Sequence, residues 1–351
     1  MSKAIRNAFR QQAAGCRAMN SPLTAEVLET LAEMLDRNSR TGARILDWPG
    51  DPMAGALKLR IAGGLHALAR SGQDAELTAL YDTGEGDFDA VLKRVLNEWD
   101  DWLYPWLDSP PQTNEVGRSA ALMAGLMVVA KRLAMPVELL ELGSSAGLNL
   151  NLDRFYYKLG DLEAGPTNAA VRIAPEWKGN APTGQSPQIV ARCGVDQNPL
   201  DVRDEAIAAR LLAYCWPDQQ DRLARLEAAI AIAHTYPPAV EAGDAADWIE
   251  HKLAEPQTKG TARIIMHSVF WQYLPSDAQS RIEAAILKAG GLATTERPLG
   301  WLSFEPDPPA VLPMQLWLRI WPSSEAFHLA ACHPHGASIS WFGAESRAWH
   351  Q

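Results

Sequence analysis

The sequence lacks the features of a membrane, secreted or nucleic-acid-binding protein. Its 351 residues contain no apolar run of about 18 residues, and the N-terminal segment MSKAIRNAFRQQAAGCRAMN has no apolar core of a signal peptide. Lys and Arg number 32 against 42 Asp and Glu, so the net charge is −10 and no basic run is present to bind a phosphate backbone. These absences predict a cytoplasmic protein that acts on a small molecule and binds neither nucleic acid nor membrane. They leave the oligomeric state open.

Cysteine is also scarce. The four cysteines are scattered, without C-x-x-C spacing, at Cys16, Cys193, Cys215 and Cys332. This pattern predicts reduced, mostly buried thiols. Cys332, His333 and His335 form a compact group, but ligands on a single loop lack a fourth partner for zinc, so a hairpin loop is the simpler interpretation and no metal is expected.

Composition and periodicity indicate an α/β protein preceded by a helical part. Hydrophobic residues make up 47% and charged residues 21%, which provides for a sizeable core. Apolar residues recur at helical spacing within 22–35, 53–69 and 88–102, so residues 1–134 are predicted to form a helical domain or cap. Residues 135–351 alternate strand and helix patterns and end in strand-like segments, which predicts a Rossmann-like, mostly parallel sheet with a C-terminal antiparallel hairpin. A Gly/Pro-rich insertion is expected at about 160–187.

The second part is organised around the segment VELLELGSSAGLNL, residues 137–150. Its apolar-rich start is typical of a buried strand, and the Gly/Ser-rich residues that follow predict a tight turn and the start of a helix. Gly143 permits the sharp turn, Ser145 is small enough for a ligand to approach the backbone, and Gly147 lets the helix begin close to the strand. The N–H groups of that first helical turn are expected to face a ligand above the sheet.

An acid precedes this turn and bears on the choice of cofactor. The pattern from Glu141 to Gly147 is E-x-G-x-S-x-G, whereas dinucleotide-binding turns have G-x-G-x-x-G. It resembles motif I of class I S-adenosylmethionine (SAM) dependent methyltransferases. A carboxylate at Glu141 would repel a dinucleotide pyrophosphate and attract the ammonium and sulfonium groups of SAM. The alternative is a structural turn that holds no ligand.

A polar segment, QTNEVGR at 112–118, precedes the apolar helix that leads to this strand. Asn114 and Glu115 either cap that helix or project into a site as substrate contacts. Capping does not account for Arg118, which carries a cation into the first helical turn against the dipole. We therefore expect Arg118 to pair with the methionine carboxylate of SAM.

Two further candidates follow predicted strands. Asp196 ends the second strand, where an acid holds ribose hydroxyls in nucleotide folds, although a turn-forming role before Asn198 is an alternative. His267 ends a later strand and is the candidate base or substrate contact, with a hydrogen-bonded structural histidine as the alternative. The residues expected to line the same pocket are Ser268, Trp271 and Tyr273.

The combination QTNEVGR, ELGSSAGLNLNLDRFYY, GVDQNP, YCWPDQQDR, GDA, HSVFWQYL and HPHG is similar to an uncharacterised bacterial family, the DUF2332 proteins, over nearly the whole chain. Its sheet domain resembles class I SAM-dependent methyltransferases. Carrying that pattern over implies cofactor contacts around the methionine, ribose and adenine parts, from Glu141, Gly143, Ser144, Ser145 and Gly147, from Asp196, and from Asp244 with Ala245. The sequence thus predicts a small-molecule methyltransferase. A non-catalytic SAM-fold or nucleotide-binding protein and an NAD(P)-dependent oxidoreductase are the alternatives.

Overall fold

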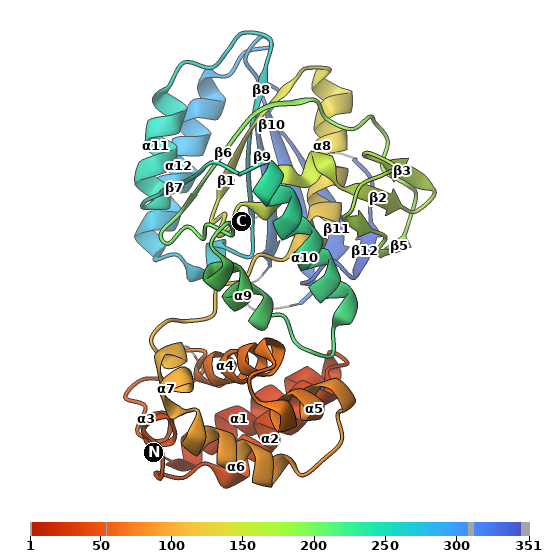
Figure 1. Ribbon diagram of the computed structural model, residues 1–351. Helices are drawn as coiled ribbons and strands as arrows, with labels where there is room; N and C mark the ends of the chain where they lie inside the picture. Colours follow the sequence, from red (N-terminus) through yellow and green to blue (C-terminus); the bar gives the residue numbers. More distant parts are fainter. Residues whose placement is uncertain (1, 54, 308–311, 345–351) are drawn as a thin grey trace. The chain divides into compact units, whose positions relative to one another are not determined.

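The computed structural model describes residues 2–53, 55–307 and 312–344. The chain forms two compact units (Figure 1). Unit 1 comprises Met1–Thr113 and Asp204–Glu227, and unit 2 comprises Asn114–Arg203 and Ala228–Gln351. Helix α10 (Gln220–Thr235) has residues in both.

The described part of unit 1 contains helices only. These are α1 (Ser2–Ala18), α2 (Pro22–Met34), α3 (Arg40–Leu46), α4 (Leu57–Ser71), α5 (Ala75–Thr83), α6 (Phe88–Glu98), α7 (Asp100–Leu103), the 3-10 helix η1 (Tyr104–Leu107) and α9 (Glu205–Ala213). The apolar face of α2 is buried in the core of this unit, as its spacing predicts, with Val27, Leu28 and Leu31 at most 1% exposed.

A late segment of the chain completes this helical unit. The Asp218 carboxylate accepts hydrogen bonds from the backbone N–H groups of Leu23 (2.8 Å) and Thr24 (3.1 Å) and from the Thr24 hydroxyl (2.8 Å). It thereby satisfies N–H groups at the start of α2, which Ser21 leaves without a side-chain cap. This division differs from the predicted boundary between residues 134 and 135, because a linear sequence pattern does not reveal that residues 204–227 return to the helical unit.

Asp218→Ala is expected to destabilise unit 1. Three donors at the start of α2 lose their acceptor, which costs about 1–3 kcal/mol of unfolding free energy. Urea unfolding followed by circular dichroism measures the loss. Asp82→Ala, at an exposed carboxylate in α5, is the control and should change stability by less than about 0.5 kcal/mol. An equal effect of both substitutions would contradict the capping role.

Unit 2 contains a nine-stranded sheet in the order β5-β12-β11-β10-β9-β8-β1-β6-β7. Strands β7, β6, β1, β8 and β9 run parallel, whereas β9, β10, β11 and β12 pair in antiparallel fashion as successive neighbours. The strands are β1 (Val137–Leu142), β5 (Glu176–Lys178), β6 (Ile189–Asp196), β7 (Val240–Ala242), β8 (Ala262–Ser268), β9 (Leu299–Pro306), β10 (Met314–Trp321), β11 (Glu325–Cys332) and β12 (Ser338–Trp341). The fold class is therefore mixed α/β, with the antiparallel C-terminal strands that the sequence predicts.

Helices cover both faces of this sheet (Figure 1). Helix α8 (Ser119–Leu133) packs on one face, where Gly125 lies against Leu302 of β9. Helices α11 (Ala245–Ala254) and α12 (Ser276–Leu292) pack on the other face, where Gly290 lies against Trp321 of β10. Within the described ranges, no helix has the length and apolar character needed to cross a bilayer.

The segment after β1 differs from the prediction. A short 3-10 helix, η3 (Leu148–Arg154), replaces the expected α-helix, and Asn151 interrupts its helical dihedral angles. The expected insertion contains β3 (Leu162–Ala164) and β4 (Arg172–Ile173), which form a small sheet with β2 (Tyr156–Leu159), and then β5 at the edge of the main sheet. Such short strands leave little periodicity in the sequence.

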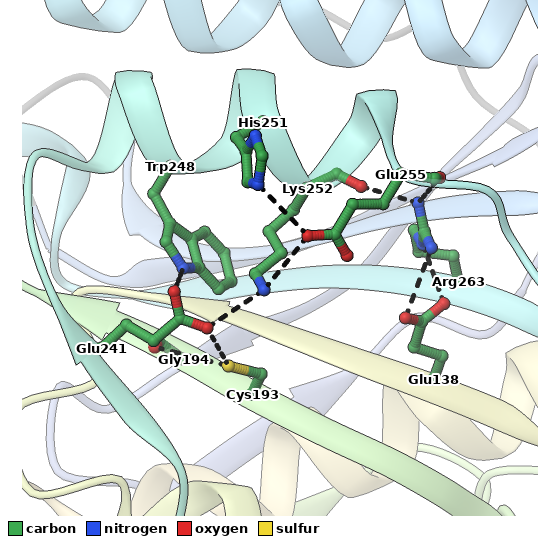
Figure 2. A network of polar contacts seen from close by, with 9 residues as sticks. All are labelled: Glu138, Cys193, Gly194, Glu241, Trp248, His251, Lys252, Glu255 and Arg263. Atoms are coloured by element: carbon green, nitrogen blue, oxygen red, sulfur yellow. Dashed lines mark hydrogen bonds and ion pairs between the residues drawn. The ribbon is translucent and has the colours of Figure 1, made fainter.

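A polar network fastens α11 to the sheet (Figure 2). The Glu241 carboxylate of β7 accepts hydrogen bonds from Trp248 Nε1 (2.9 Å) and Cys193 Sγ (3.2 Å) and pairs with Lys252 Nζ (3.0 Å). Burial and the Glu241 hydrogen bond raise the pKa of the Cys193 thiol to about 11, so this cysteine stays protonated at neutral pH. We therefore interpret the network as structural, with Cys193 present as an unreactive thiol.

Candidate functional site

The carboxyl ends of β1 and β8 meet where the connections change direction across the sheet. After β1 the parallel sheet grows through β6 and β7 on one side, whereas β8 and β9 follow on the other side. Crevices at such positions are where open parallel sheets bind ligands. The predicted cofactor residues lie at the carboxyl ends of neighbouring strands: the turn follows β1, Asp196 ends β6, and Asp244 follows β7. The topology therefore brings them to one edge of the sheet.

Backbone N–H groups of the turn after β1 already have acceptors in the protein. Ser145 N–H donates to Asp196 Oδ2 (2.8 Å), and Leu148 N–H donates to Asn114 Oδ1 (2.8 Å). Two more donate to carbonyl oxygens, Ser144 N–H to Val195 (3.0 Å) and Gly147 N–H to Ser144 (2.7 Å). The expectation that this turn directs free N–H groups at a ligand is therefore wrong for these four, and they provide no cradle for a phosphate.

The same segment holds buried oxygen atoms without partners. Glu141 Oε2, Ser145 Oγ and Asn149 Oδ1 have no hydrogen-bond partner in the described chain, and these residues are 2%, 5% and 1% exposed. Burial raises the pKa of Glu141 to about 8, against the lowering influence of the Ser144 hydroxyl and the Arg118 charge. A buried oxygen atom that accepts no hydrogen bond costs folding free energy. A bound ligand that donates hydrogen bonds to these atoms would lower that cost.

The polar segment before α8 supports this turn. Asn114 accepts from Leu148 as described, and Glu115 Oε1 accepts from Gly117 N–H (2.9 Å) and caps the 3-10 helix η2 (Val116–Arg118). Both residues are less than 9% exposed. Both residues thus cap short 3-10 helices, Asn114 at the start of η3 and Glu115 at η2, and not α8 as the capping interpretation had it. A substrate role for either stays a prediction.

Arg118 has partners that the sequence did not suggest. Its Nε donates to the Pro334 carbonyl (3.0 Å) and its NH1 group to the Ser268 carbonyl (3.2 Å). These contacts connect the loop after β11 to the end of β8. Arg118 ends η2 directly before α8, and the two carbonyl oxygens account for its position without any bound anion. Pairing of Arg118 with a ligand carboxylate stays a prediction.

Asp196, which ends β6, and Asp244, which follows β7, accept hydrogen bonds from nearby backbone N–H groups. Asp196 Oδ1 accepts from Asn198 N–H (2.9 Å), while Oδ2 holds the Ser145 N–H. Asp244 caps α11 by accepting from the N–H groups of Ala246 (2.8 Å) and Asp247 (3.0 Å), and Ala245 is the buried first residue of that helix. Contacts of Asp196 and Asp244 to ribose and adenine stay predictions.

His267 is a poor candidate for a catalytic base. Its Nε2 accepts from Trp301 Nε1–H (3.0 Å), and its Nδ1 lies 2.7 Å from Glu305 Oε1. Both ring nitrogens are thus engaged, and the residue is 1% exposed. His267 pairs with Leu142 in register, so its side chain leaves the face of the sheet opposite to that of Glu141. This geometry supports the alternative interpretation, a hydrogen-bonded histidine at a strand end.

Ser268 ends β8, and Trp271 and Tyr273 follow it in the 3-10 helix η4 (Trp271–Tyr273). The Trp271 ring stacks on the His267 ring, with centroids 5.3 Å apart, and the Ser268 carbonyl accepts from Arg118. Tyr273, at the end of η4, is 74% exposed. A common pocket of these residues with His267 stays a prediction.

Sequence reasoning missed the residues that shape the loop after β8. Glu305, at the end of β9, accepts from the N–H groups of Phe270 (3.0 Å) and Trp271 (3.3 Å) as well as facing His267. Val269 has φ +53°, a conformation that β-branched residues rarely adopt. The Phe270 ring then fills the space that a side chain at Gly143, φ +67°, would need. The position of Glu305 at the carboxyl end of a strand was the available signal.

A small cavity lies beside the turn. It has a volume of about 150 Å³ and is bounded by apolar residues and one ion pair, namely Ala146, Pro199, Leu200, Asp201, Val202, Arg203, Ala233, Pro237, Pro238 and Val240. Drug-sized ligands occupy sites of about 300 Å³ or more, so this cavity has room for only part of such a ligand. No group of three or more His, Cys, Asp or Glu residues suited to a metal occurs among the residues that the structure covers.

Comparisons with known proteins identify a family but no activity. The chain matches a family model, DUF2332, described as "Uncharacterized protein conserved in bacteria", over residues 6–341. No curated protein matches it. A solved structure described as the "DhpI-SAM-HEP complex" is similar with a TM-score of 0.23 and 12% sequence identity, over 62% of this chain and 65% of that chain. At that TM-score the likeness carries no argument about a ligand.

Proposed function

The chain belongs to the DUF2332 family, and we propose from its site that it is a SAM-dependent methyltransferase acting on a small molecule. The observation that carries the proposal is Glu141, a buried acid near the carboxyl end of β1 whose Oε2 has no partner among the described residues. In the same segment Ser145 Oγ and Asn149 Oδ1 also lack partners among the described residues, and four backbone N–H groups have acceptors in the protein. Such a site favours a ligand rich in donors and positive charge.

SAM meets these requirements through its amino acid part. Its ammonium group would donate to Glu141 and to the unpartnered oxygens of Ser145 and Asn149, and its sulfonium adds a second positive charge near the acid. Arg118 lies close enough to influence the Glu141 charge, and it is the proposed partner of the ligand carboxylate. When bound, SAM supplies a methyl group for transfer. The protein contributes alignment and exclusion of water.

A nicotinamide dinucleotide fits the same atoms less well. A pyrophosphate needs free N–H donors, and the turn N–H groups of Ser145 and Gly147 have acceptors in the protein. Glu141, once ionised, would repel it. The geometry therefore ranks the oxidoreductase below both the methyltransferase and a non-catalytic SAM-binding protein.

A ligand panel tests the proposal. Equilibrium dialysis should show binding of SAM and S-adenosylhomocysteine and none of NAD or NADP. Glu141→Gln should weaken SAM binding at least about tenfold, because one charge-assisted contact is lost. Glu163→Gln, at an exposed glutamate of β3, is the matched control and should leave binding unchanged. Binding of NAD in place of SAM would overturn the proposal, and SAM binding without transfer of labelled methyl to any small molecule would leave the non-catalytic alternative.

A further inference from the structure

The small cavity of unit 2 lies apart from the residues predicted to hold the cofactor. Its walls come from the turn after β1 at Ala146, the loop after β6 at residues 199–203, and the end of α10 with the residues that lead into β7, 233–240. On β7 the cavity contacts the amino end of the strand. Asp196 and Asp244, the predicted ribose and adenine contacts, stand at the carboxyl ends of β6 and β7. The cavity is therefore a candidate site for a second ligand.

Apolar side chains form most of the cavity wall. Ala146, Val202 and Ala233 are at most 2% exposed. The other apolar residues of the wall are Pro199, Leu200, Pro237, Pro238 and Val240. The cavity has a volume of about 150 Å³, and in another protein an apolar cavity of about 150 Å³ holds benzene. This cavity therefore has room for one six-membered ring or a branched aliphatic group.

Hydrogen bonds and proline rings hold these walls in place. The Leu200 N–H donates to the Ser145 carbonyl oxygen (3.1 Å), and His234 Nε2 donates to the Val202 carbonyl oxygen (2.9 Å). The three prolines of the wall have φ fixed by their rings. A cavity that is formed before the ligand arrives requires little ordering of the chain, so more of the contact free energy contributes to affinity.

An ion pair at the exposed side of the cavity determines the charge of the ligand. Arg203 and Asp201 both line the cavity, and their side chains are 58% and 53% exposed. Both Asp201 oxygens accept from Arg203, Oδ1 from Nε (2.9 Å) and Oδ2 from NH2 (2.7 Å). The NH1 group of Arg203 has no partner among the residues that the structure describes. The donor left for a ligand thus belongs to the cation, and a ligand amine would have to compete with Arg203 for Asp201.

We propose that this cavity binds a small carboxylic acid with a compact apolar body, such as an aromatic acid. The ring of the ligand lies between the loop after β6 and the prolines before β7. Its carboxylate accepts from the NH1 group of Arg203, which Asp201 holds in place through two hydrogen bonds. The site needs neither SAM nor Glu141, so the proposal is independent of the proposed function.

Titration of benzoate into the full-length protein at neutral pH and constant ionic strength, in the absence of SAM, tests this site. Broadening of the benzoate ring signals in NMR spectra measures binding. Benzoate should bind saturably. Benzylamine has the same ring and the opposite charge, and it should bind at least about tenfold more weakly. Absence of saturable benzoate binding, or equal affinity for the two compounds, overturns the proposal.

Two variants assign the binding to this cavity. Arg203→Gln should weaken benzoate binding about tenfold, because one charged contact is lost. Arg37→Gln is the matched control, since Arg37 forms a similarly exposed surface pair with Asp47 and should be dispensable for binding. Ala233→Leu fills the cavity and should abolish binding, with an unchanged or raised Tm as evidence of folding. If Ala233→Leu lowers Tm, Arg203→Gln decides. Wild-type benzoate affinity in Arg203→Gln or in folded Ala233→Leu overturns the proposal.

Discussion

Glu141→Gln is expected to stabilise the protein at alkaline pH. The folded state raises the carboxyl pKa from 4.5 to about 8, so between these values the folded protein holds a proton that the unfolded chain has released. The free energy of unfolding of wild type therefore falls as pH rises through this window. Glutamine stays neutral, and the variant should gain on the order of 5 kcal/mol over wild type at pH above 8 and nothing below about pH 4.5. Urea unfolding at a series of pH values measures the difference.

Glu138→Gln is the matched control on the same strand. Glu138 pairs with Arg263 (2.8 Å), whose side chain is only 5% exposed (Figure 2). Glu138 lies three positions before Glu141 on β1, so the two side chains leave opposite faces of the strand. Glutamine leaves that guanidinium buried without a countercharge and should cost about 1–3 kcal/mol near neutral pH. The two glutamates are thus expected to respond with opposite signs. A gain for Glu141→Gln that does not vary with pH would contradict the buried, protonated carboxyl.

Glu305→Ala is expected to cause the second large effect. Its carboxylate accepts from the N–H groups of Phe270 and Trp271 and from the His267 ring, so its removal leaves two partly buried N–H donors and the buried His267 ring without their acceptor. The cost is about 3–5 kcal/mol of unfolding free energy. Near-ultraviolet circular dichroism should also change, because the Trp271 ring stacks on His267. The loop that covers Gly143 would loosen as a result.

Glu325→Ala on β11 is the control for that substitution. Its partner Arg132 lies 3.2 Å away, and the two side chains are 41% and 34% exposed. Such a surface pair contributes about 0–1 kcal/mol. Equal losses for Glu305→Ala and Glu325→Ala would show that the loop after β8 does not depend on Glu305.

Local patterns predicted the elements that carry the site. The strand before Gly143, the strand ending at Asp196 and the helix beginning after Asp244 follow from apolar runs and turn or cap residues, which act over a few positions. Parallel pairing then brings these ends to one edge of the sheet.

Long-range contacts could not be predicted in this way. Phe270 fills the space over Gly143, and Glu305 lies opposite His267 only because β8 and β9 pair in one particular register. Arg118 meets the Pro334 carbonyl from a distant loop. The sequence therefore suggested His267 as a base or substrate contact and Arg118 as the partner of a ligand carboxylate, and neither interpretation anticipated these protein partners.

Calorimetric titration of SAM into the protein at pH 7, in two buffers of different ionisation enthalpy, tests the central claim most directly. A Glu141 carboxyl with a pKa of about 8 is mostly protonated at this pH, and an arriving ammonium should displace its proton. The account predicts SAM binding with release of about one proton in wild type, and no proton release in Glu141→Gln. Absence of SAM binding, or binding whose proton release is the same in both proteins, would contradict it.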